Sequence, residues 1–166
     1  MKASIYSLFV MSIMVLFLGS CKNEEYPKNP DGELTWITID QAAELQNKDQ
    51  KFYFVDVYTE WCGWCKKMDK STFQDTEVIK YLDENYHVVK FDAEDKRAIT
   101  WQDSEYLYKP GGRRGVNMLA RELLNGRLSY PSFAVLDENR NPLKVIIGYK
   151  TPEQLLEDLK PLRTNS

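Results

Sequence analysis

The chain has 166 residues, of which 43% are hydrophobic and 28% are charged, and its formal net charge is −3. This length and composition indicate one globular domain with enough apolar residues to form a core. The sequence contains no block rich in Lys and Arg, so nucleic acid is not an expected partner.

The first twenty residues have the composition of a signal peptide. Lys2 is their only charged residue, and an apolar run covers residues 7–19. This run ends in small residues that lead into Cys21, which resembles a bacterial lipobox, where the signal is cleaved before a cysteine that becomes lipidated. A plain signal peptide and an uncleaved anchor are the alternatives, but the run is shorter than the roughly 20 residues that span a bilayer.

We therefore divide the chain into a signal peptide at 1–20, a lipidated cysteine with a flexible tether at 21–33, and a folded domain at 34–166. The tether is polar, contains prolines and shows no periodicity. This organisation predicts an exported protein, lipid-anchored in the bacterial cell envelope. We expect it to face the periplasm, with the cell surface as the alternative.

The folded part opens with alternating strand and helix signals. Leu34–Ile39 is a short β-type run, and Asp40 is a plausible N-cap for a helix over 41–48. Phe52–Thr59 is almost continuously apolar and rich in β-branched and aromatic residues, which is typical of a central strand covered on both faces.

A helix is predicted to begin at Cys62 and to run toward Thr72. Asp75 or Thr76 should cap a second helix over 77–86, and His87–Ala93 should form the next strand. Residues 96–115 are less regular and contain a Pro-Gly-Gly turn.

The last third of the chain predicts a helix, a hairpin and another helix. Residues 116–125 have a helical pattern that stops at Gly126, and strands at 132–137 and 143–150 flank a hairpin turn. Thr151 and Gln154 form a capping-box pattern for the final helix. The element order therefore indicates an α/β domain with a mixed sheet and helices on both faces.

Cys62 and Cys65 have two residues between them and stand where a strand ends and a helix begins. The N–H groups and dipole of a helix N-terminus favour a thiolate, and Lys66 and Lys67 add positive potential. We expect Cys62 to lie at the exposed end of the turn and to attack a disulfide. Cys65 would then resolve the mixed disulfide by attacking Cys62.

Asp56 stands in the middle of the apolar strand, where a carboxylate is costly unless it has a task. With a raised pKa, it could accept and return the proton of Cys65. The alternatives are a solvent-facing position at a strand edge and a structural hydrogen bond.

A structural zinc site is disfavoured, because it needs four ligands and His87 is the only other soft candidate in the mature domain. A purely structural disulfide is also disfavoured, because so small a ring stabilises weakly. We expect no metal and no cofactor besides the redox-active cysteine pair itself.

The segment "VDVYTEWCGWCKKM" (55–68) resembles the active-site region of thioredoxins. Tyr130 and Pro131 resemble the thioredoxin-fold dipeptide whose peptide bond is cis, and Lys90 occupies the place of the lysine near the buried aspartate. Gly148 fits the glycine that leaves room beside the active site. The resemblance runs from about Trp36 to Leu162 and implies a thioredoxin fold, with a central mixed sheet of four to five strands.

A further likeness is to the C-terminal thioredoxin-like domain of the membrane electron transporter DsbD. It rests on the stretch after the active-site helix, with Thr72, Phe73, Asp75 and Val78. The resemblance implies a thiol–disulfide oxidoreductase that reduces disulfides of exported proteins. Its partners would be protein or small-molecule disulfides and an upstream thiol donor, such as a membrane electron transporter.

The resemblance also implies which residues surround the cysteines. Cys62, Cys65, Asp56 and Lys90 would carry the chemistry, and the substrate would be contacted by a set around them: Trp61, Gly63, Trp64, Tyr130 and Pro131. The dipeptide Gly63-Trp64 departs from the Gly-Pro of thioredoxin, so the redox potential does not carry over. An oxidase or isomerase, and a non-catalytic binding module on the same scaffold, are the alternative functions.

The segment 96–115 is longer than in a minimal thioredoxin. Two interpretations of its aromatic and basic residues remain open, a cover for the sheet edge and a surface for docking a partner. The residues concerned are Trp101, Tyr106, Tyr108, Arg113 and Arg114.

Overall fold

A computed structural model describes residues 32–46 and 48–164, so the predicted signal peptide and Cys21 lie outside the described residues. Within them, no helix is long and apolar enough to cross a membrane. The elements follow in this order: β1 (Ile37–Thr38), α1 (Ile39–Glu44), β2 (Phe52–Tyr58), α2 (Gly63–Asp69), a 3₁₀ turn (Thr72–Gln74), α3 (Thr76–Asn85), β3 (Tyr86–Asp92), β4 (Ile99–Trp101), β5 (Ser104–Tyr106), β6 (Tyr108–Lys109), β7 (Val116–Asn117), α4 (Met118–Leu123), β8 (Ser132–Leu136), β9 (Pro142–Ile147) and α5 (Pro152–Thr164).

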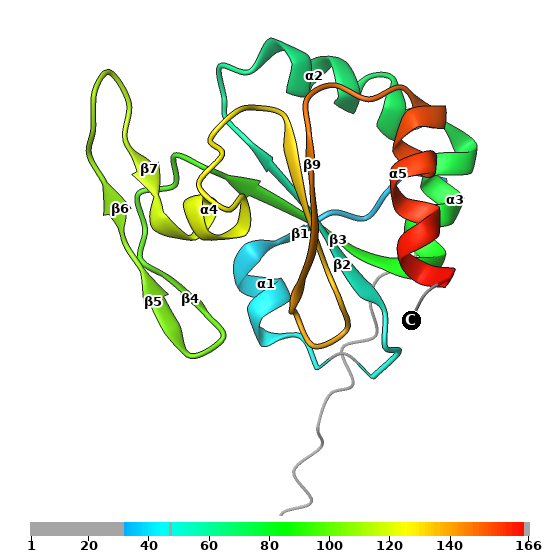
Figure 1. Cartoon of the computed structure of the whole chain (residues 1–166), viewed down its shortest axis with the longest axis horizontal. Helices are drawn as coiled ribbons and strands as arrows, with labels where there is room; N and C mark the ends of the chain where they lie inside the picture. Colours follow the sequence, from blue (N-terminus) through cyan, green and yellow to red (C-terminus); the bar gives the residue numbers. More distant parts are fainter. Residues whose placement is uncertain (1–31, 47, 165–166) are drawn as a thin grey trace, which may run out of the picture.

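The central sheet has five strands in the order β1-β3-β2-β8-β9 (Figure 1). β2 lies in the middle, parallel to β3 on one side and antiparallel to β8 on the other. Its first six residues are all buried, as their apolar run predicts. The mixed α/β sheet of four to five strands expected from the sequence is thus confirmed.

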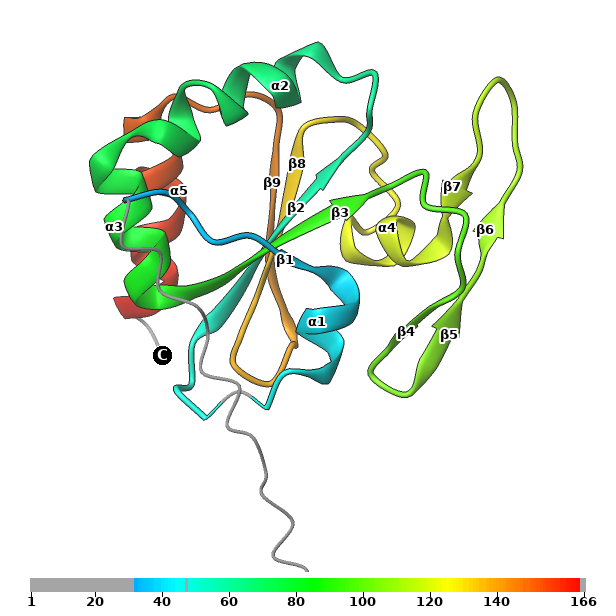
Figure 2. The ribbon, with the colours of Figure 1, turned by 180° about the vertical axis from the view of Figure 1, so that it is seen from behind.

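Helices cover both faces of this sheet. α1 and α4 pack on one face, where Tyr53 and Val55 of β2 point into a core shared with β4. α2, α3 and α5 pack on the other face, where Phe54 stacks on Phe133 with ring centroids 5.1 Å apart. Figure 2 shows the same two helical layers from behind, with the sheet between them.

The start of the domain differs from the prediction. The strand expected at Leu34–Ile39 is only Ile37–Thr38, and the helix already begins at Ile39. Thr38, not Asp40, is the N-cap: its hydroxyl accepts the N–H of Gln41, whose side chain in turn accepts the N–H of Thr38. This capping box ends the strand early, because the Thr38 side chain offers the helix an acceptor two residues ahead of Asp40.

Other predicted helix starts are confirmed. The Asp75 carboxylate accepts the N–H groups of Glu77 and Val78 at the start of α3. Thr151 and Gln154 form the predicted capping box at α5. The helix expected over 116–125 is shorter, because residues 116–117 pair with β6 and Asn117 caps α4.

Residues 96–117 form two hairpins, β4–β5 and β6–β7. Trp101 is buried in the core beside α1 and α4, and Tyr106 packs against the same core. This part of the segment therefore packs into the core on one face of the sheet. The β6–β7 hairpin stands apart from the body (Figures 1 and 2).

Candidate active site

The two cysteines lie at the junction of β2 and α2 and form a disulfide. Cys62 is the N-cap of α2, and its sulfur accepts a hydrogen bond from the Cys65 N–H at 3.1 Å. Their Cα atoms are 5.3 Å apart. The helix start thus holds both sulfur atoms on one turn, as the spacing predicts.

The expectation that Cys62 lies exposed is wrong, because Cys62 and Cys65 are each only 4% exposed. The Cys62 N–H donates to the Thr59 carbonyl at 3.0 Å, and this turn folds the start of α2 back onto the end of β2. Two large exposed side chains flank the cysteines instead, since Trp61 is 49% exposed and Trp64 is 57% exposed.

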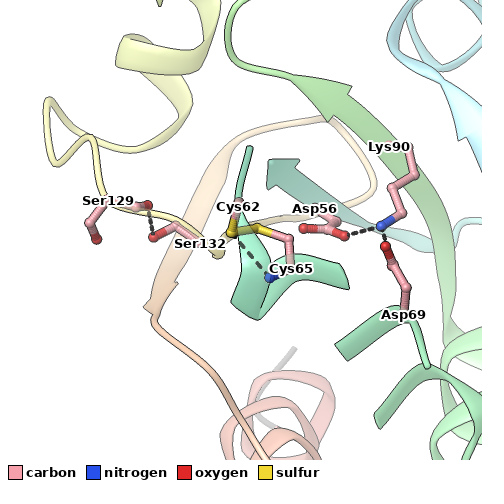
Figure 3. Close-up of a disulfide and its surroundings, with 7 residues drawn as sticks. All are labelled: Asp56, Cys62, Cys65, Asp69, Lys90, Ser129 and Ser132. Atoms are coloured by element: carbon pink, nitrogen blue, oxygen red, sulfur yellow. Dashed lines mark hydrogen bonds and ion pairs between the residues drawn. A yellow bond between two sulfur atoms is a disulfide. The ribbon is translucent and has the colours of Figure 1, made fainter. Parts of the chain in front are cut away.

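Asp56 is buried next to the disulfide. The sheet register places it opposite Lys90 on β3, whose amine lies 2.6 Å from Asp56 Oδ2. Asp56 Oδ1 is buried and has no hydrogen-bond partner among residues 32–46 and 48–164. In Figure 3 the carboxyl group lies between the disulfide and the Lys90 amine. The strand-edge alternative is thereby excluded, because Asp56 is 1% exposed in the central strand.

Burial raises the pKa of Asp56 to about 6, although the positive charge of Lys90 opposes the shift. For Lys90, burial lowers the pKa, but the carboxylates of Asp56 and Asp69 outweigh burial and raise it overall. At neutral pH the Asp56 carboxyl is therefore mostly ionised. It can accept a proton, and it holds one in slightly more acidic solution.

Asp69 is a member of this charge cluster that the sequence analysis missed. Its carboxylate contacts the Lys90 amine at 2.5 Å, on the side away from Asp56. Asp69 also lines a cleft of about 230 Å³ with Trp36, Phe73 and Lys90. The sequence signal was present, because Asp69 follows Cys65 by four residues on one helix and so shares its face.

The loop before β8 contains the predicted proline. The Tyr130–Pro131 peptide bond is cis, as the resemblance implied. The Pro131 carbonyl accepts the N–H of Gly148 at 2.8 Å, and Gly148 has a φ of +81°, which favours glycine. The Tyr130 ring meets Trp61 edge to face at 6.0 Å between centroids. The structure therefore brings residues 130–131 beside the turn that carries the cysteines.

The exposed tryptophans each belong to a small cluster. Trp61 Nε1 donates to the Glu94 carboxylate at 2.8 Å, and the Arg114 guanidinium lies 5.2 Å from the Trp61 ring centroid. Trp64 lies 5.4 Å from the Tyr149 ring. Glu94 and Tyr149 were not predicted, because nothing in their sequence surroundings marks a contact across more than 30 residues.

Gly63, between the cysteines, is exposed with open space around its Cα.

In the described part of the chain, no group of three or more His, Cys, Asp or Glu side chains is arranged to hold a metal ion. His87 is buried and contacts Asp49 at 3.0 Å. The chemistry available at this end of the sheet is thus that of a disulfide, a buried carboxylate and its lysine.

Comparisons with a family model and with a solved structure agree on the fold. A family model described as a thioredoxin-like domain matches residues 39–162. A thioredoxin from Thermus thermophilus superposes with a TM-score of 0.59 at 17% identity, covering 80% of this chain and 89% of that one. This likeness shows that the fold is the thioredoxin fold.

Two curated relatives share shorter segments. Protein disulfide-isomerase A3 of Gallus gallus is 29% identical over 72 residues, which are 43% of this chain and 14% of that protein. The thiol:disulfide interchange protein DsbD of Pseudoalteromonas atlantica is 39% identical over 44 residues, which are 26% of this chain and 7% of that protein. The matched segments therefore span about a seventh or less of these relatives' own length.

Proposed function

Because this chain belongs to the thioredoxin-like domain family and carries a Cys62–Cys65 disulfide, we propose that it reduces disulfides of exported proteins by thiol–disulfide exchange. One observation carries the proposal: the disulfide at the start of α2 lies beside a buried carboxylate that is paired with a lysine. A structural disulfide has no need of such a pair.

In the proposed reaction, the dithiol form of the protein acts on a substrate disulfide. The Cys62 thiolate attacks one substrate sulfur, the substrate S–S bond breaks, and the other substrate sulfur leaves and takes a proton from solvent. The product is a mixed disulfide between Cys62 and the substrate. The N–H groups at the start of α2 stabilise the Cys62 thiolate before this attack.

Cys65 then resolves the mixed disulfide. The unpartnered Oδ1 of Asp56 takes the proton of the Cys65 thiol, and the resulting thiolate attacks the Cys62 sulfur. The bond to the substrate breaks, and its second sulfur leaves and is protonated. Two electrons have passed from the cysteine pair to the substrate, and the Cys62–Cys65 disulfide is restored. An upstream dithiol donor must reduce it again for a new cycle.

Reduction is the direction we propose because the downstream likeness is to DsbD and because no histidine stands between the cysteines. The reduction potential of the Cys62–Cys65 couple tests this directly. We expect a value near that of thioredoxin, about −270 mV, by equilibration with glutathione or dithiothreitol buffers. A value near that of DsbA, about −120 mV, would instead support the oxidase alternative.

The proposed location follows from the sequence around Cys21. We propose that the protein is exported and anchored in the cell envelope by a lipid on this cysteine, where a membrane electron transporter can serve as the donor. Labelling of cells with a tagged fatty acid should mark the wild-type protein and not Cys21→Ser. An unlabelled wild-type protein would remove the anchor from the proposal and leave the chemistry intact.

Reduction of insulin with dithiothreitol as the donor tests the activity. Wild type should accelerate precipitation of the insulin B chain, and Cys62→Ala should be inert because the attacking sulfur is gone. Cys65→Ala should accumulate mixed disulfides with substrate proteins, since its second step is blocked. Equal inertness of wild type and Cys62→Ala would favour a binding module over an enzyme.

A further inference from the structure

The β6–β7 hairpin is an exposed extension beside the active site. Its strands pair Tyr108 with Asn117 and Lys109 with Val116, and its turn is formed by 110–115. Figures 1 and 2 show this turn directed toward the end of the molecule where α2 begins. No part of the proposed exchange reaction uses it.

Arg114 connects the hairpin to the residue before the attacking cysteine. Its guanidinium lies over the Trp61 ring at 5.2 Å, and its Nη1 lies 3.5 Å from the Glu94 carboxylate. The same carboxylate accepts the Trp61 indole N–H at 2.8 Å. Trp61 in turn contacts Tyr130, next to the cis proline. The hairpin is thus continuous with the surface that surrounds the disulfide.

The hairpin is basic in an acidic protein. Lys109, Arg113 and Arg114 are the only charged residues between Tyr106 and Asn117, whereas the whole chain has a net charge of −3. All three are exposed, and the Arg114 side chain is 56% exposed despite its contact with Trp61. Arg113 has no ion-pair partner among the residues that the structure describes.

Most acidic groups near this surface are engaged within the molecule. Both Glu94 oxygens face Trp61 or Arg114, and Asp95 is paired with Arg97 at 2.7 Å. Asp92 is half-buried and accepts the N–H of Glu94. The exposed carboxylate of Glu60, next to Trp61 in the chain, opposes the hairpin in sign. The outer face beside Trp61 therefore has more free positive than negative charge.

We propose that the β6–β7 hairpin selects disulfide substrates whose reacting cysteine is flanked by acidic residues. The inference rests on the proposed function, because it names the substrate class of that same site. Exposed charges within about 10 Å of an approaching peptide act mainly on its association rate, and salt screens them. The hairpin would thus steer acidic segments toward Cys62 before any bond forms.

The test uses three synthetic peptides that differ only next to one cysteine, with Asp-Asp, Ser-Ser or Lys-Lys flanks. Each cysteine is joined by a disulfide to thionitrobenzoate, whose release by the reduced protein is followed by absorbance. We expect the acidic peptide to react about three- to tenfold faster than the Ser peptide in low salt, and the basic peptide to react more slowly. The ratio should approach one in about 0.5 M salt.

The ratio of the acidic to the Ser rate is also measured in variants. Arg113→Gln should lower it and the double variant Arg113→Gln/Arg114→Gln should bring it close to one. Arg121→Gln is the matched control, because it removes one exposed positive charge from α4 and should keep the wild-type ratio.

The outcomes separate this inference from the function on which it rests. If no peptide is reduced by the wild-type protein, the proposed function fails. If all three are reduced at equal rates, the function stands and selection by the hairpin is wrong. If the preference for the acidic peptide survives in the double variant, or if Arg121→Gln abolishes it equally, the preference comes from charges outside the hairpin. Selection by the hairpin is then wrong.

Discussion

Asp56 is the single carboxylate in a strand whose neighbouring residues are buried and apolar. Its place in the middle of β2 could be read from the sequence, because a polar residue inside such a run stands out. Its partner could be named only from family resemblance, since Lys90 lies 34 residues away and meets Asp56 through the sheet register. Asp69 is the third member of the cluster, and its carboxylate contacts the Lys90 amine on the side away from the disulfide.

Replacing Asp56 should stabilise the oxidised protein at neutral pH. The pKa of Asp56 is about 6 in the fold and about 3.9 in the unfolded chain, so the folded state binds this proton more tightly. The contribution of Asp56 to the free energy of unfolding therefore falls as the pH rises from about 4 to about 6. Asp56→Asn removes the cost of burying this charge, and we expect the free energy of unfolding to rise by on the order of 2–3 kcal/mol at pH 7.

Urea denaturation of the oxidised protein at pH 4.5 and pH 7 measures this effect. The gain should shrink to about 1 kcal/mol at pH 4.5, where Asp56 is protonated in the fold but still mostly ionised in the unfolded chain. Asp69→Asn is the matched control, because it removes a half-exposed carboxylate from the same lysine and should give no such gain. A loss of stability in Asp56→Asn at pH 7 would mean that its bond to Lys90 outweighs the burial of its charge.

At the scale of elements, the sequence correctly predicted the strands, turns and helix caps whose signals are local. The apolar run of β2, the cysteine turn before α2 and the caps of α3 and α5 are all as predicted. The elements that were predicted wrongly depend on competition between a strand and a helix cap, or on pairing between two separate segments. β1 is shortened by the Thr38 capping box, and the two-residue strands β6 and β7 exist only through pairing with each other. No periodicity can show in two residues.

The cap of α3 gives a prediction at this scale. Asp75→Ala removes the acceptor of two backbone N–H groups, so the variant should be about 1 kcal/mol less stable. Asp75→Asn keeps an oxygen at the cap and should lose much less. Chemical denaturation of both variants gives the comparison, and an equal loss in both would assign the effect to the charge at the helix start instead of to the hydrogen bonds.

At the scale of the whole molecule, one sheet separates two cores. The core with α1 and α4 includes Ile99, and the core with α2, α3 and α5 includes Ile146. Both side chains are almost completely buried. The cores share only the strands of the sheet, because the side chains of each strand alternate between its faces.

Ile99→Val and Ile146→Val should each lower the free energy of unfolding by about 0.5–1.5 kcal/mol. Because the two sites lie on opposite faces of the sheet, the losses should add within about 0.5 kcal/mol in the double variant. Denaturation of the four proteins that make up this cycle is the measurement. A large deviation from additivity would show that the two cores are coupled through the strands between them.

The register that pairs Asp56 with Lys90 also bears on the newly made chain. The two cysteines are three residues apart and can meet in an unfolded polypeptide, whereas Asp56 and Lys90 meet only after α3 has carried the chain from β2 to a parallel β3. An incompletely folded molecule therefore has both sulfur atoms of the site, but it lacks the paired carboxylate that we propose as the proton acceptor of Cys65. In the proposed reaction, resolution by Cys65 would therefore reach its full rate only when the sheet is complete, and thiol exchange by nascent molecules would be restrained.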